Sequence, residues 1–210
     1  MSEARVVVVR HGETQWNAEM RFQGYSDSPL TAIGLAQAEA LAARLATEKF
    51  DAIYSSDLGR VRQTIAPLIA RTGQDVQFSA DLRERCYGML EGKTLPELEA
   101  EFPGELANYR GRDPRSVPPG GESMEQFHNR IVATLERIAG ENLGRKIAVV
   151  AHGGVLSALY RHANGMPLNA ARSYTLNNAS INRFRFAKKR WVVDLWGDVS
   201  HLSGDVLSDL

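Results

Sequence analysis

Two stretches of the sequence end in a similar way, with a histidine and a glycine at the end of a run of small apolar residues. His11 and Gly12 follow a valine-rich run and Arg10, and His152 and Gly153 follow a second apolar run. If both runs are parallel strands of one sheet, their carboxyl ends share an edge, where open sheets bind ligands. A single buried histidine is more often a hydrogen-bonded core residue, but two at matched strand ends favour function. Because glycines let backbone N–H groups approach a ligand and helix N-termini favour anions, we expect an anion-binding crevice.

Two arginines point to the same kind of ligand. Arg10 directly follows four valines, where a charge is costly unless it meets an anion or leaves the core. Its guanidinium group suits phosphate, which it grips through two parallel hydrogen bonds. Arg60 lies in the first turn of a predicted helix, where a cation opposes the helix dipole and needs a compensating anion. Taken alone, Arg10 could be an ion-paired strand end and Arg60 an ordinary surface residue.

The elements that must position these side chains follow from hydrophobic periodicity and capping residues. We predict strands over 6–9, 51–55, 147–151 and within 73–80, and a terminal hairpin from 180–186 and 191–196. We predict helices over 31–47, after a cap at Ser56, and after 153–154, with capping boxes at 94–97 and 123–126 that begin two further helices. Residues 103–121 are predicted to form a loop or lid. Pro67 predicts a kink or an early end of the second long helix. This alternation of strands and helices favours a mainly parallel sheet flanked by helices.

The composition excludes several classes of partner. Lys plus Arg equals Asp plus Glu, 25 each, so the chain lacks the basic excess of a nucleic-acid binder. The one basic cluster, residues 188–190, lies between two alternating runs and is typical of a solvated hairpin turn. A single cysteine, Cys86, suits a reducing compartment. Without a signal-like or membrane-spanning run, we expect a soluble cytoplasmic protein with no nucleic-acid or membrane partner.

A longer series of motifs resembles a known family, the histidine phosphatase superfamily, also called phosphoglycerate-mutase-like. The matching blocks, in family order, are residues 10–14 with Trp16 and Asn17, 22–24, 29–31 with Gly34, Gln37 and Ala38, 54–58 with Arg60 and Thr64, 82–84 with 87–88 and 91–92, 119–123, and 150–154. Five or more ordered blocks are far more specific than one Arg-His-Gly triplet. The resemblance implies a three-layer α/β/α fold with a mainly parallel central sheet. It also implies a single domain over 1–210, with a helical or loop lid insertion at about 90–122.

The resemblance also implies roles for individual residues. His11 corresponds to the nucleophile that forms a phosphohistidine intermediate, and its second ring nitrogen must donate to an acceptor that the sequence does not name. Arg10, Arg60 and His152 would surround the phosphoryl group and balance its charge. Further contacts to phosphate or substrate are implied for Asn17, Gln23, Gly24 and Gly153.

Glu84 matches the family's proton donor. It would protonate the leaving oxygen and then deprotonate the attacking water. Taken alone it lies between Arg83 and Arg85, where a surface salt bridge is the simpler interpretation. No metal and no cofactor are implied, because the two histidines lack a carboxylate or cysteine at ligand spacing and arginines supply the positive charge.

The same chemistry serves a phosphatase or a mutase. Cofactor-dependent mutases of the family carry a longer insertion and tend to follow the acid with His-Tyr-Gly, whereas residues 84–88 read Glu-Arg-Cys-Tyr-Gly here. The short insertion and the Pro-Gly-Gly-Glu-Ser run at 119–123 resemble the phosphatase branch. We therefore expect a phosphomonoester hydrolase acting on small phosphorylated metabolites.

Two alternatives stay open: a cofactor-dependent phosphoglycerate mutase, and a catalytically silent phosphate-binding regulatory domain. The lid arginines Arg110, Arg112 and Arg115 fit either a grip on a substrate anion or a solvated loop. The aromatic residues Trp16 and Tyr109 fit either substrate stacking or packing. The physiological substrate and the oligomeric state are left open, with a homodimer among the alternatives, and the tail over 201–210 is assigned no role.

Overall fold

The computed structural model describes residues 2–203, so the last seven residues of the C-terminal tail lie outside the described residues. The strands are β1 (Ala4–Arg10), β2 (Ala52–Ser56), β3 (Val76–Ser79), β4 (Lys146–Ala151), β5 (Ile181–Ala187) and β6 (Arg190–Asp198). The helices are α1 (Gln15–Ala18), α2 (Ala32–Leu45), α3 (Gly59–Thr72), α4 (Leu95–Glu101), α5 (Pro103–Gly111), α6 (Met124–Glu141) and α7 (Gly153–Ala163), with short 3₁₀ turns at Ala80–Leu82 and Gly88–Leu90.

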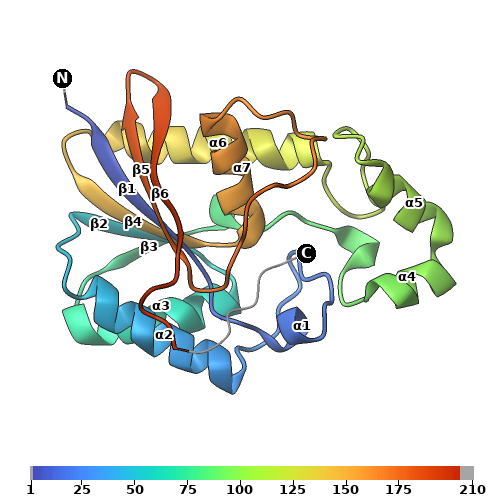
Figure 1. Cartoon of the computed structure of the whole chain (residues 1–210), viewed down its shortest axis with the longest axis horizontal. Helices are drawn as coiled ribbons and strands as arrows, with labels where there is room; N and C mark the ends of the chain where they lie inside the picture. The colour runs from blue at the N-terminus through green and yellow to red at the C-terminus, as the bar shows by residue number, and fades with distance from the viewer. Residues whose placement is uncertain (1, 204–210) are drawn as a thin grey trace.

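One six-stranded sheet, ordered β3-β2-β4-β1-β5-β6, forms the middle layer. The strands β1, β2, β3 and β4 are mutually parallel where they pair, whereas β5 is antiparallel to β1 and forms a hairpin with β6. Helices α6 and α7 lie on one face of this sheet, and α2 and α3 lie on the other (Figure 1). The predicted three-layer α/β/α fold with a mainly parallel sheet is therefore confirmed.

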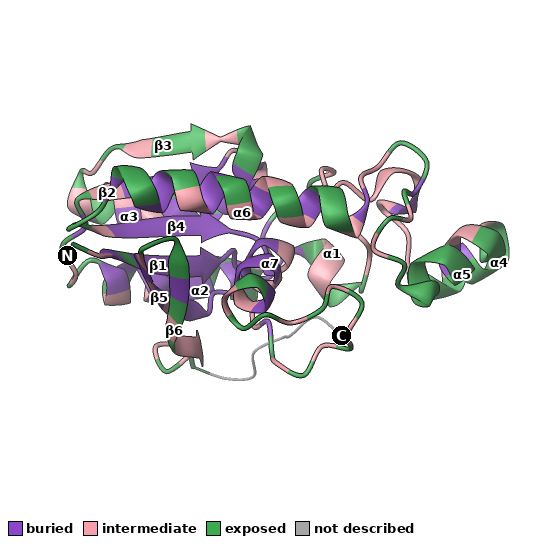
Figure 2. Cartoon of the chain, turned by 90° about the horizontal axis from the view of Figure 1, so that it is seen from above, coloured by how far each residue is buried: buried purple, intermediate pink, exposed green. Residues whose placement is uncertain are grey.

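The valine run of β1 packs on both faces because side chains of a strand alternate in direction. Val6 and Val8 belong to the core under α6 and α7, whereas Val7 and Val9 belong to the core over α2 and α3. Helix α6 presents one buried stripe to the sheet and exposes the opposite face, as Figure 2 shows. The strand end at Arg10 is thereby fixed in the centre of the molecule.

Helices α4 and α5 stand apart from the sheet and carry their own small core (Figures 1 and 2). Leu90, Leu98 and Leu106 are its buried side chains. The expected loop over 103–121 is wrong for its first half, because residues 103–111 form α5. Pro103 begins this helix, a position where a missing N–H costs nothing, and Leu106 anchors it.

Two further expectations about α3 are wrong. Ser56 does not cap this helix, whose N-cap is Leu58 without a side-chain cap bond, because the Ser56 hydroxyl is engaged elsewhere. Of the two effects predicted for Pro67, the early end is wrong, because the helix continues to Thr72 and the loss of one backbone hydrogen bond is offset by buried side chains on either side of the proline; the kink stays a prediction. The predicted capping boxes at Thr94 and Ser123 are both present. Among residues 2–203, no helix combines the length and apolar character needed to cross a bilayer.

Candidate active site

The candidate catalytic side chains lie at or beyond the carboxyl ends of parallel strands, and Arg10 is the last residue of β1. His11 follows β1, Arg60 lies in the first turn after β2, Glu84 follows β3, and His152 follows β4 as the N-cap of α7. The imidazole rings of His11 and His152 are 5.4 Å apart between centroids, in an edge-to-face arrangement. The predicted convergence of the two histidines is present.

His11 is held in one tautomer. Its Nδ1 lies 2.8 Å from the carbonyl oxygen of Gly12, and because a carbonyl only accepts, Nδ1 carries the proton. The lone pair is therefore on Nε2, so Nε2 is the ring nitrogen that can act as an acceptor or attack an electrophile. Gly12 is thus the acceptor that the sequence could not name.

The loop behind His11 is fixed by both α2 and α3. The Gly12 N–H donates to the Thr64 hydroxyl, and the Glu13 N–H donates to the Gln37 side chain. Gly34 lets α2 approach this loop, because a Cβ at that position would lie 2.0 Å from the Glu13 carbonyl oxygen. The backbone that carries the histidine is therefore rigid before any ligand binds.

Burial keeps both histidines neutral. Desolvation lowers the pKa of His11 well below its usual value of 6.5, and the neighbouring charges of Arg60 and Arg10 lower it further. The pKa of His152 is lowered by burial and then by the same arginines together with His11. A neutral His11 keeps its Nε2 lone pair available at neutral pH.

This burial predicts a pH dependence of stability. The folded-state pKa of His11 lies below the unfolded value. The contribution of His11 to the free energy of unfolding is therefore fully present above pH 6.5 and is lost as the pH falls below 6.5, by up to about 1.4 kcal/mol per pH unit. We expect the free energy of urea unfolding of the wild type to fall more steeply between pH 7.5 and 5 than that of His11→Asn. Parallel pH curves for the two proteins would contradict the buried neutral state.

Arg60 is almost fully buried and its charge is compensated within the chain. Its guanidinium donates to the Asp27 carboxylate at 2.9 Å, to the Ser26 carbonyl at 3.0 Å and to the Gly24 carbonyl at 2.8 Å. The sequence predicted a compensating negative charge for Arg60, because a cation in the first turn of a helix opposes the helix dipole. Asp27 supplies that charge, in addition to any ligand. Arg10 is also buried, and its guanidinium donates to the carbonyl of Leu176.

His152 is oriented by Ser56. The Nε2 atom of His152 lies 2.8 Å from the Ser56 hydroxyl, which also accepts a bond from the Leu58 N–H. The Ser56 hydroxyl can either donate its proton to Nε2 or accept from an Nε2–H. In the tautomer in which it donates, Nδ1 of His152 carries the ring proton and is a donor. This Nδ1 and Nε of Arg60 are buried without a hydrogen-bond partner among residues 2–203, which indicates a ligand that completes them.

Glu84 is held by two backbone N–H groups. One carboxylate oxygen accepts from the Arg85 N–H at 2.8 Å and the other from the Gly154 N–H at 2.8 Å. Gly154 leaves room for this contact, since a Cβ would lie 2.0 Å from the carboxylate and would displace it. The neighbouring Arg83 forms its ion pair with Asp57, so a salt bridge between Arg83 and Glu84 is not what explains the position of Glu84.

The acid-bearing loop is clamped from α6. Arg130 donates to the carbonyls of Asp81, Arg83 and Glu84 and pairs with Glu122. The Glu122 carboxylate also accepts from the N–H of Cys86, two residues beyond Glu84. These bonds from Arg130 fix the position of the backbone that carries Glu84. They join residues more than 40 positions apart, so local sequence could not predict them.

The predicted contact residues take different places. Asn17 accepts from the Thr14 backbone and hydroxyl through its side-chain oxygen. Gly24 adopts a left-handed φ of +57° and offers its carbonyl to Arg60. Gln23 is buried beside it, and Gly153 is the first residue of α7, where N–H groups have no partner within the helix.

The lid residues mostly have structural partners. Tyr109 packs edge-on against Phe22 and Tyr87, which favours the packing alternative for this residue. The Trp16 ring lies close to Gly92, where an added Cβ would be 3.3 Å from it. The ion pairs and hydrogen bonds of the lid arginines are Arg110 with Glu99, Arg115 with Asp113, and Arg112 with the Ala170 carbonyl.

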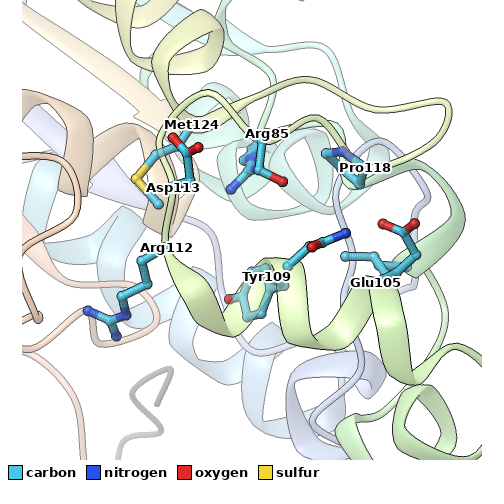
Figure 3. Close-up of a pocket in the computed structure, with 10 residues that line it drawn as sticks. Arg85, Glu105, Tyr109, Arg112, Asp113, Pro118 and Met124 are labelled. Atoms are coloured by element: carbon cyan, nitrogen blue, oxygen red, sulfur yellow. The ribbon is translucent and has the colours of Figure 1, made fainter.

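A cavity of about 20 Å³ lies under α5, with Arg85, Tyr109 and Met124 in its wall (Figure 3). That volume accommodates one water molecule.

Sequence reasoning missed Asp27, Ser56 and Asn178. Asn178 is fully buried directly before β5, and its side-chain nitrogen donates to the His11 carbonyl and to Asn17. A serine that follows a buried strand was a signal for Ser56, although it also fits a helix cap. No local pattern marks Asp27 or Asn178.

Comparison with known proteins matches this geometry to one family. Residues 6–199 match the model of the histidine phosphatase superfamily (branch 1). A metal-independent phosphoserine phosphatase of Arabidopsis thaliana is 42% identical over 202 residues, covering 94% of this chain and 83% of that protein. A probable phosphoglycerate mutase of Salmonella choleraesuis is 38% identical over 211 residues, covering 98% of each chain.

A solved structure shares the fold. It is described as a putative alpha-ribazole-5'-P phosphatase of Escherichia coli, with a TM-score of 0.85 at 26% identity, covering 93% of this chain and 96% of that one. The predicted family resemblance and the phosphoglycerate-mutase-like fold are therefore confirmed.

Proposed function

This chain belongs to the histidine phosphatase superfamily (branch 1), and from that premise we propose that it hydrolyses phosphomonoesters through a phosphohistidine formed on His11. The observation that carries the proposal is the neutral, buried His11, whose Nδ1–H is committed to Gly12 and whose Nε2 is left to attack. The prediction of a phosphatase is confirmed by the family and by the phosphatase relative at 42% identity, and the name of that relative, a metal-independent phosphoserine phosphatase, supports a reaction without a metal.

In the first step, Nε2 of His11 attacks phosphorus, and the bond between phosphorus and the ester oxygen breaks. Glu84 gives a proton to the leaving oxygen, so that an alcohol departs. In the second step, water attacks the phosphohistidine, Glu84 accepts a proton from that water, and the N–P bond breaks to release phosphate. His11 is returned neutral.

The charge of the phosphoryl oxygens is balanced by the residues around them. We propose that Arg10, Arg60 and the Nδ1–H of His152 stabilise the equatorial oxygens, and that Asn17 adds a side-chain donor. Because Arg60 and Ser56 are already held by hydrogen bonds, their donors need little reorganisation when charge develops. Gly153 is proposed to add a backbone N–H, and Gln23 and Gly24 to form the pocket wall.

The proposed substrate class is small phosphorylated metabolites. Support comes from the relatives, whose names include a phosphoserine phosphatase and an alpha-ribazole-5'-P phosphatase. The mutase-named relative at 38% identity keeps phosphoglycerate mutase activity as the second candidate, since water and a sugar-acid hydroxyl accept the same phosphoryl group.

The first test is phosphate release from p-nitrophenyl phosphate in excess EDTA. We expect turnover to survive chelation, because arginines and histidines supply the charges that a metal would supply. Vanadate is expected to inhibit by imitating the five-coordinate transition state.

Each other outcome has a meaning. Loss of activity in EDTA with recovery on adding a divalent metal would overturn the metal-free mechanism. Turnover insensitive to vanadate would show that the proposed cage does not bind a five-coordinate phosphorus. If p-nitrophenyl phosphate is not hydrolysed, conversion of 3-phosphoglycerate with 2,3-bisphosphoglycerate would identify the mutase.

We propose that the chain is a single catalytic domain over 1–210, with residues 90–122 forming a lid. The separate small core of α4 and α5 supports the lid, because these helices pack mainly on one another. The single cysteine supports a location in the cytoplasm. The zero net charge supports the absence of a nucleic-acid partner. A homodimer stays one of the open alternatives, which sedimentation of the purified protein distinguishes from a monomer.

A further inference from the structure

The segment directly before β5 is bound closely to the nucleophile strand. Over residues 176–180 it offers the Leu176 carbonyl to the Arg10 guanidinium and the Ser180 carbonyl to the Arg10 N–H. It also gives the Ala179 N–H to the His11 carbonyl at 3.1 Å. Ala179 is fully buried with a left-handed φ of +54°, which is costly for a residue with a side chain. The chain keeps this conformation where it braces Arg10 and His11.

Asn178 lies at the centre of this brace. Its side-chain nitrogen donates to the His11 carbonyl at 3.1 Å and to the Asn17 side-chain oxygen at 3.2 Å. Both partners are acceptors, so both hydrogens of this amide are committed and its orientation is fixed. The Asn178 side-chain oxygen has no partner among residues 2–203, so the orientation comes from the two donated bonds alone.

These bonds fix the position of the oxygen end of the Asn17 amide. The Asn17 oxygen accepts from the Thr14 N–H at 3.1 Å, from the Thr14 hydroxyl at 3.0 Å and from Asn178. Three donors gathered on the oxygen turn the nitrogen end of the amide away from Thr14 and Asn178. An anion requires that end, because a side-chain carbonyl would repel phosphate oxygens.

We propose that Asn178 is a positioning residue of the proposed reaction. It ties the backbone of the nucleophile His11 to the amide of Asn17, and so presents Asn17 to the phosphoryl group as a hydrogen-bond donor. This inference rests on the proposed function, and it adds to the site a residue from the far end of the chain that acts through Asn17 and His11.

The test compares Asn178→Ala and Asn178→Asp with the wild type. We expect kcat/KM for p-nitrophenyl phosphate and the affinity for vanadate to fall about 10- to 100-fold in Asn178→Ala, since small misplacements of reacting groups cost that much. The loss in the double variant with Asn17→Ala should be close to the larger single loss, because both changes remove the same oriented donor.

The aspartate variant separates positioning from mere structure. A carboxylate faces two acceptors and repels them, whereas a protonated carboxyl donates one hydrogen. The activity of Asn178→Asp relative to the wild type should therefore rise as pH falls from 8 to 5.5, while that of Asn178→Ala relative to the wild type should stay flat.

The matched control is Asn142→Ala. Asn142 is also buried and donates to the Tyr54 hydroxyl and the Ile138 carbonyl, outside the site. It should lower the melting temperature and leave kcat/KM unchanged per folded molecule. Variants of Asn178 with vanadate affinity and kcat/KM within twofold of the wild type would overturn the proposal. Vanadate affinity reports on it even if His11→Ala shows that the proposed function fails.

Discussion

Replacing His11 with alanine is expected to lower kcat/KM by roughly 10⁴-fold or more while the protein stays folded. The change removes the Nε2 lone pair that the Nδ1–H bond to Gly12 holds in place, and with it the proposed covalent route. The measurement is phosphate release from p-nitrophenyl phosphate in EDTA. A second measurement is retention of labelled phosphate on the wild-type protein after rapid quenching in alkali, where phosphohistidine survives.

His128→Ala is the matched control. His128 is half-buried on α6 and contacts the ring of His162, outside the site. It should keep wild-type turnover and show no change in labelling. Appreciable turnover by His11→Ala, or label retained on that variant, would assign the nucleophile to another residue.

Replacing Glu84 with glutamine is expected to give the second largest effect, with a loss that depends on the leaving group. An alkyl alcohol needs a proton to depart, so hydrolysis of an alkyl phosphate should fall about 10²- to 10⁴-fold. p-Nitrophenolate departs without a proton, so its release should fall much less. Glutamine retains the length of the side chain and an acceptor for one of the two N–H groups of Arg85 and Gly154, and the loss of the other bond affects both esters alike, so the difference between the esters reports on the proton.

The comparison uses initial rates with both esters for Glu84→Gln and for Glu136→Gln. Glu136 is a partly exposed carboxylate on α6 near His162, and its change should leave both rates unaltered. Equal losses with the two esters would mean that Glu84 acts on the shape of the pocket, and not as the acid.

The sequence predicted the sheet and the histidines because both depend on local patterns. A β-branched run followed by His-Gly marks a strand that ends at a ligand site, and this pattern holds at His11 and at His152. The capping boxes at Thr94 and Ser123 depend on four consecutive residues, so they were predicted with the same success.

The remaining contacts depend on neighbours that are distant in sequence. Ser56 has the residue type of a helix cap, but a buried imidazole 96 residues away takes its hydroxyl. Residues 103–111 have the composition of a loop, yet packing of Leu106 against the α4 side of the lid makes them helical. Asn178 meets His11 across 167 residues, which no local window reveals.

The sheet order has a consequence for how the molecule is made. The first strand, β1, is flanked by β4 and β5, so both its neighbours come from residues beyond 145. A nascent chain can hold His11, Arg60 and Glu84 long before any partner strand exists for β1. Closing such distant pairings is slow, since loop entropy is lost before contacts form. Synthesis must therefore pass β5 before the protein turns over its first substrate, and in refolding experiments activity should return with the slowest phase of compaction.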